Sequence, residues 1–208
     1  MISLIFAVSS FSYTIPGYKF TLPEWGSKDP AAYDKCLSDF KAEYKEKTGK
    51  EADIKHTVYS ICVANKVLLE NNPKTFDEYI SLLPKEIDRI AVLMTCVYSD
   101  KFILEVYNYT KDLKESIICV RNINNVKKLG LKYEDVCRRC VEIAQQDPKY
   151  LVVAEIFFNA MNQCENDDML KPQLTKLNRI YSALLVDEKL RAQVEPIVAK
   201  IRTILSTY

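Results

Sequence analysis

A chain of 208 residues in which 48% are hydrophobic and 27% are charged has the composition of a folded globular protein. Its 29 Lys and Arg residues against 28 Asp and Glu residues give a net charge of +1, without the basic surplus that typifies nucleic-acid binders. Because of this charge balance, we expect no nucleic-acid partner. No window approaches the roughly 20 apolar residues of a transmembrane helix, so we also expect no membrane span.

The first element is a short apolar segment, Ile2 to Val8, followed by the small residues Ser9, Ser10 and Ser12. An apolar run that ends in small residues is typical of a secretory signal peptide, so residues 1–12 are predicted to be removed and the protein to be secreted. No Lys or Arg precedes the run, and the alternative is an ordered N-terminal segment of a soluble protein.

Residues 13–29 are predicted to form an extended arm. Pro16, Gly17, Pro23 and Gly26 interrupt any regular element there, and the aromatic residues of the arm, Trp25 among them, are expected to pack onto the body of the protein.

Helical periodicity governs the rest of the chain, residues 30–208, which we expect to form one domain. Asp29, Pro30 and Gly49 predict the start and the end of the first helix. Further helices are expected over 53–71, from Thr75 to about residue 98 with a kink or a new start at Pro84, over 102–130, over 133–144, over 147–164, and from near Pro172 and near Asp187. Together they predict an all-α fold, a compact, disulfide-linked bundle of seven or eight helices with an N-terminal arm.

A weak internal similarity suggests another organisation of the helical region. The segment SICVAN around Cys62 resembles IICVRN around Cys119. Two duplicated helical halves that meet near residue 99 would explain it, and coincidence between short apolar segments is the alternative.

Seven cysteines fit an oxidising compartment, where thiols pair. Cys36 and Cys62 each lie 13 residues from Gly49, so a helical hairpin would bring them level. The same reasoning about Gly130 pairs Cys119 with Cys140, and Cys96 with Cys164 is the third expected bridge. Cys137 then stays reduced or links a second chain into a dimer. The alternative is seven buried thiols in a reducing compartment.

Catalytic motifs are sparse, and we expect a protein that is not an enzyme and that needs no metal or cofactor. His56 is the only histidine and has no partner motif, so a structural role is expected. Cys137 and Cys140 have the spacing of metal ligands, but zinc sites need a second such pair or two histidines. Asn108 begins an N-glycosylation sequon, Asn-Tyr-Thr, which makes the chain a candidate glycoprotein.

Two functions remain. In the first, the helices enclose an aromatic-lined cavity for a small hydrophobic ligand, because the chain holds thirteen Tyr and eight Phe. The ligand-binding residues would then be Trp25, Phe157, Phe158 and Met161. In the second, the protein has a solid core and binds another extracellular protein through its surface, as a salivary, venom or immune-facing factor does.

Overall fold

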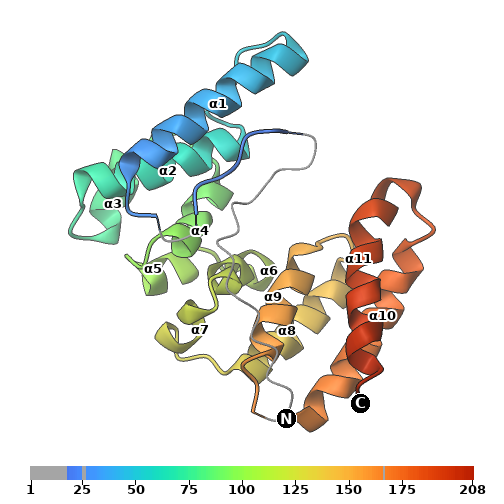
Figure 1. Ribbon diagram of the computed structural model, residues 1–208. Helices are drawn as coiled ribbons and strands as arrows, with labels where there is room; N and C mark the ends of the chain where they lie inside the picture. The colour runs from blue at the N-terminus through green and yellow to red at the C-terminus, as the bar shows by residue number, and fades with distance from the viewer. Residues whose placement is uncertain (1–17, 25–26, 166) are drawn as a thin grey trace. The chain divides into compact units, whose positions relative to one another are not determined.

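The computed structural model describes residues 18–24, 27–165 and 167–208. Within them it contains eleven α-helices and two 3-10 helices (Figure 1). The all-α prediction is confirmed for these residues, whereas the helices outnumber the seven or eight expected. The expected signal peptide over residues 1–12 and Trp25 lie outside the described residues. Among the described helices, none combines the length and the apolar character that crossing a bilayer requires.

The chain divides into two compact units. The first ends at Asn122 and the second covers Ile123–Tyr208. The division therefore does not fall near residue 99, where duplicated halves were expected to meet.

The first unit is built on a hairpin of two helices, α1 (Pro30–Thr48) and α2 (Thr57–Asn71), which run side by side (Figure 1). Asp29 caps α1 by accepting a hydrogen bond of 3.0 Å from the backbone N–H of Ala31. Gly49 ends the helix with a φ of 70°, a left-handed conformation that glycine adopts without strain. The predicted bounds of α1 are confirmed.

The part of the arm that the structure describes packs against α1. Phe20 and Leu22 are buried, and the Phe20 ring lies 5.2 Å from the Phe40 ring, edge to face. The carboxylate of Glu43 accepts hydrogen bonds of 2.8 Å and 3.0 Å from the backbone N–H groups of Lys19 and Phe20. One carboxylate therefore fixes the arm to the helix, because it satisfies two backbone donors that would otherwise lack partners.

Helix α4 (Arg89–Tyr98) lies at the centre of the first unit, since every residue from Ala91 to Tyr98 is buried. Its N-cap, Asp88, accepts hydrogen bonds from the backbone N–H of Ile90 at 3.0 Å and from the Thr57 hydroxyl at 2.5 Å. This cap therefore also joins α4 to the start of α2. The short helix α3 (Phe76–Leu82) precedes α4 and is capped by Thr75.

The single helix expected over 102–130 is wrong. The structure has three short helices there, α5 (Ile103–Tyr107), α6 (Leu113–Ser116) and α7 (Asn124–Lys128), and a 3-10 helix, η1 (Ile117–Arg121). Side chains compete with the helical hydrogen bonds in this stretch. Thr110 and Asp112 each accept a hydrogen bond from a backbone N–H two residues further on, which favours turns over a continuous helix. These short helices account for most of the excess over the expected number.

The second unit consists mainly of two helical hairpins. Helix α8 (Tyr133–Gln146) packs on α9 (Val152–Met161), and α10 (Leu170–Leu184) packs on α11 (Glu188–Leu205), as Figure 1 shows. The short 3-10 helix η2 (Asp167–Met169) leads into α10. Apolar residues recur along these helices at helical spacing, so each presents one stripe to the core of the unit. Asp187 caps α11 by accepting a hydrogen bond of 3.0 Å from the backbone N–H of Lys189.

Candidate functional site

A series of aromatic side chains connects the core of the first unit to its surface. Tyr79 is fully buried, and its hydroxyl donates a hydrogen bond of 3.1 Å to the backbone oxygen of Ala64. The Tyr79 ring is stacked on Phe102, with 6.3 Å between centroids. Phe76 then lies 6.1 Å from Phe102 and 5.6 Å from Tyr109, both edge to face. Each ring therefore packs against the next, and the last ring of the series, Tyr109, is exposed to solvent.

The outer end of this series carries exposed apolar surface. Tyr109 is 38% exposed and Leu104, on the neighbouring helix α5, is 58% exposed. We call Phe76, Phe102, Leu104 and Tyr109 the aromatic turn. Phe102 has a φ of 55°, which is rare for a residue with a side chain, and this left-handed conformation directs the chain into α5.

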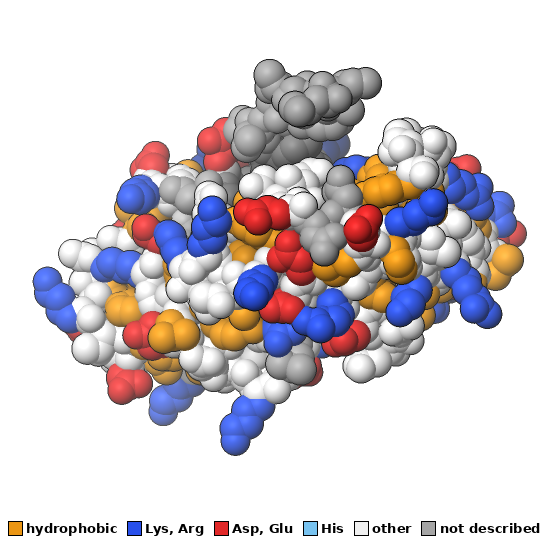
Figure 2. All heavy atoms as spheres, turned by 90° about the horizontal axis from the view of Figure 1, so that it is seen from below, with side chains coloured by type: hydrophobic (Ala, Val, Ile, Leu, Met, Phe, Trp, Pro, Cys, Tyr) orange, Lys and Arg blue, Asp and Glu red, His pale blue; other side chains and the backbone are white. Residues whose placement is uncertain are grey.

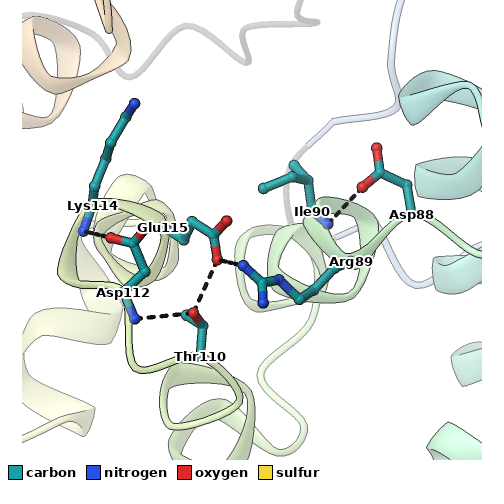
Figure 3. Close-up of polar contacts among 7 residues, drawn as sticks. All are labelled: Asp88, Arg89, Ile90, Thr110, Asp112, Lys114 and Glu115. Carbon is teal, nitrogen blue, oxygen red and sulfur yellow. Dashed lines mark hydrogen bonds and ion pairs between the residues drawn. The ribbon is translucent and has the colours of Figure 1, made fainter. Parts of the chain in front are cut away.

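Polar contacts hold the segment that follows Tyr109 (Figure 3). Glu115 forms an ion pair with Arg89 and accepts a hydrogen bond of 2.9 Å from the hydroxyl of Thr110. The same Thr110 oxygen accepts a hydrogen bond of 3.1 Å from the backbone N–H of Asp112. The hydrogen bond to Glu115 raises the pKa of the Arg89 guanidinium, which stays charged. Helices α4 and α6 are thus joined beside the aromatic turn.

Asn108, the sequon asparagine, is exposed at the end of α5, directly before Tyr109. Its backbone N–H donates a hydrogen bond of 3.0 Å to the backbone oxygen of Leu104. The acceptor is therefore accessible, as N-glycosylation requires.

The expected ligand-binding residues of the second unit all lie on α9. Phe157 is fully buried in α9, Phe158 is 6% exposed, and Met161 is half-buried. The ammonium of Lys200 lies 4.2 Å from the centre of the Phe158 ring. A hollow of about 290 Å³ lies along α8 instead, lined by Leu131, Asp135, Val136, Arg138, Arg139 and Glu142. Its lining does not include any of the expected residues.

Six of the seven cysteines have another cysteine as a neighbour. The sulfur atoms of Cys36 and Cys62 lie 2.6 Å apart, so the hairpin geometry inferred from Gly49 is correct for this pair. No two sulfur atoms lie at the covalent distance of a disulfide. The disulfide linkage expected from the sequence is therefore not shown.

The other neighbours differ from the expected ones. Cys119 lies against α4 beside Cys96, while the sulfur of Cys164 lies 3.8 Å from that of Cys137. Cys137, which was expected to stay reduced or to link a second chain, is fully buried, and burial argues against the second of these alternatives. The expected pairing of Cys119 with Cys140 relied on one long helix before Gly130, and the structure has short helices there instead.

His56 has the structural role expected from the sequence. Its Nδ1 atom accepts a hydrogen bond of 3.3 Å from the backbone N–H of Val58 and so caps α2, while its ring lies 4.6 Å from the ring of Phe40. Within the described residues, no group of three or more His, Cys, Asp or Glu side chains is arranged to hold a metal ion.

Sequence reasoning missed the aromatic turn, because its residues come from α3, α5 and the connections beside them. The signal that was available is the density of aromatic residues over 102–109, which contains Phe102, Tyr107 and Tyr109. On the face drawn in Figure 2, basic and acidic side chains are interspersed.

No protein-family model, no curated protein and no solved structure matches this chain.

Proposed function

We propose that this chain is a secreted, non-enzymatic helical protein that binds another protein through the aromatic turn. The observation that carries the proposal is the continuous series of rings that runs from the buried Tyr79 to the exposed Tyr109, together with the exposed Leu104 on α5. The partner would present an apolar patch of similar size, because exposed apolar surface gains free energy when it is covered.

The chemistry of this surface supports a protein partner. Tyrosine is enriched at protein interfaces, where a rigid ring with one polar end contributes large contact area. Charged groups border the apolar centre, among them Lys101, whose ammonium lies 6.0 Å from the centre of the Phe102 ring, and the ion pair of Arg89 with Glu115. An apolar centre with a charged rim is the usual anatomy of such interfaces.

Secretion and glycosylation are parts of the same proposal. They rest on the apolar run over residues 1–12, on the seven cysteines and on the exposed asparagine of the sequon. A glycan on Asn108 would lie next to Tyr109, so binding should be measured for the protein with the glycan and for the protein without it.

Carriage of a small hydrophobic ligand is the second candidate. No specific observation favours it, since Phe157 and Phe158 are buried in the core of the second unit. It predicts a bound lipid in the purified protein, which native mass spectrometry detects as added mass.

The test is a binding screen of the full chain, made in eukaryotic cells, against an array of extracellular protein domains. We expect at least one domain to bind the native protein, and Leu104→Lys or Tyr109→Lys to weaken that binding at least tenfold. Val186→Lys is the matched control, because Val186 is an exposed apolar residue of the second unit, 82% exposed, and should not affect binding.

Two outcomes would overturn the proposal. One is binding that Val186→Lys weakens as much as Leu104→Lys does. The other is a protein that binds no domain and retains lipid, which would support the carrier instead. Asn108→Gln removes the glycan and should leave the binding intact.

A further inference from the structure

The cysteines meet in three pairs, each within one unit and each between two helical segments. Cys36 on α1 faces Cys62 on α2, and Cys137 on α8 faces Cys164 just after α9, with sulfur atoms 2.6 Å and 3.8 Å apart. The third pair lies between α4 and η1. The sequence separations are similar, 26 and 27 residues for the two measured pairs.

The pair between α4 and η1 rests on the packing of these two elements. Both thiols are fully buried, and the sulfur of Cys119 lies 3.9 Å from the backbone oxygen of Leu93, one turn before Cys96 on the same helix. Asn122, just beyond η1, donates a hydrogen bond of 3.5 Å to the backbone oxygen of Val97. The two thiols also hydrogen-bond each other, and burial, together with this contact, raises the pKa of Cys96.

We propose that the mature protein carries three disulfides, Cys36–Cys62, Cys96–Cys119 and Cys137–Cys164, and keeps Cys140 as a buried thiol. Each bond forms when two thiols lose two protons and two electrons. Glutathione disulfide, or an oxidised dithiol enzyme of the secretory route, takes up both and is reduced to two thiols. The sulfur atoms then approach to about 2.05 Å, which the Cys36 and Cys62 side chains nearly reach and which Cys137 and Cys164 reach by turning toward each other.

Cys140 is excluded from the pairing by its position. It lies one turn after Cys137 on α8, and two cysteines three residues apart on one helix do not present the geometry of a disulfide. It is fully buried, and burial raises the pKa of its thiol, which keeps it protonated and unreactive. The presence of the disulfides in the mature protein rests on the secretion included in the proposed function, whereas the choice of partners follows from packing within each unit.

Peptide mapping tests the proposal directly. Trypsin cleaves after Lys and Arg, and Lys or Arg separates all seven cysteines along the chain, Cys137 from Cys140 by the pair Arg138 and Arg139. The full chain is purified reduced from a cytosolic host and oxidised, while folded, with a mixture of glutathione and glutathione disulfide. It is then denatured, and remaining thiols are blocked with N-ethylmaleimide.

We expect a mass decrease of about 6 Da before blocking, because three bonds remove six hydrogens. The map should contain three linked peptide pairs and a blocked Cys140. In Cys36→Ser, only Cys62 should become blocked in addition, and Cys140→Ala should still lose about 6 Da, which makes it the matched control.

Other results would overturn the proposal. One is blocking of any of the six paired cysteines in the oxidised native chain. Another is recovery of Cys119 linked to Cys140, or of Cys96 linked to Cys164. Because the map is made on the native sequence, a variant that does not fold leaves the main result unaffected.

Discussion

The two units reach stability in different ways. The second unit holds four helices of at least ten residues, and each buries one regular stripe of apolar residues. The first unit depends more on single side chains that satisfy backbone groups, such as Glu43 of α1, which binds the arm, Asp88 at the start of α4, and Thr110 after the aromatic turn. In periodic packing the stabilisation is distributed over many apolar contacts, whereas the stabilisation from a polar contact such as that of Glu43 depends on one residue.

The largest effect is expected in the core of the second unit. Phe157→Ala should lower the free energy of unfolding by about 3–5 kcal/mol, because it removes a fully buried ring and leaves a cavity. Chemical denaturation measures the change, and hydrogen exchange should accelerate more in α8 and α9 than in α1 and α2. Val186→Ala, at an exposed site, should change stability by less than about 0.5 kcal/mol. An equal acceleration of hydrogen exchange in both units would show that the loss of the Phe157 ring destabilises the two units together.

Removal of a cysteine pair is expected to have the next largest effect. In the oxidised protein, replacing both Cys36 and Cys62 with Ala should lower the free energy of unfolding by about 3 kcal/mol more than in the reduced protein, because a cross-link restricts the unfolded chain. The pair Cys137 and Cys164 closes a loop of similar length, so it should give a similar difference in the second unit. Cys140→Ala should show no such dependence on oxidation.

Each unit has a helix whose N-cap is an aspartate, Asp88 for α4 and Asp187 for α11, so the same substitution can be compared in both units. Asp88→Ala should cost about 1–2 kcal/mol, since Asp88 caps α4 and also accepts the hydrogen bond from Thr57. Asp187→Ala, at the cap of α11, should cost about 1 kcal/mol. Thermal unfolding of the two variants measures the difference. Equal losses would contradict the view that the cap in the first unit also joins two helices.

Acidification should produce the smallest effect, and it should be confined to the arm. Burial opposes ionisation of Glu43, but the backbone N–H groups of Lys19 and Phe20 and the Lys47 ammonium outweigh it, so the pKa of Glu43 lies below its ordinary value. The anchoring is therefore complete above the unfolded pKa, near 4.5, and is lost as the pH falls through the lower folded value.

The amide NMR signals of Lys19 and Phe20 report the release. In Glu43→Gln, which cannot ionise, these signals should lose their pH dependence between pH 5 and about pH 2. Persistence of the transition in that variant would assign it to another group.

The sequence predicts elements whose signal is local and repeated. Asp29, Pro30 and Gly49 mark both ends of α1, and the level positions of Cys36 and Cys62 follow from that hairpin. The prediction from periodicity fails over 102–130. Apolar residues recur there at helical spacing, but the side chains of Thr110 and Asp112 accept hydrogen bonds from the backbone, which favours turns over a continuous helix. The other two cysteine pairs and the aromatic turn depend on that stretch or on contacts between distant segments, which periodicity does not reveal.

The order of the three proposed disulfides along the chain bears on how such bonds would form during synthesis. Cys36, Cys62, Cys96 and Cys119 pair in the sequence in which they emerge, so no loop encloses or interleaves with another. A chain that is oxidised as it enters the secretory route joins each cysteine to the next one available, and needs no disulfide isomerase for these two bonds. Only between Cys137 and Cys164 does another cysteine, Cys140, emerge. Cys140 lies one turn after Cys137 on α8, where the two cannot form a disulfide.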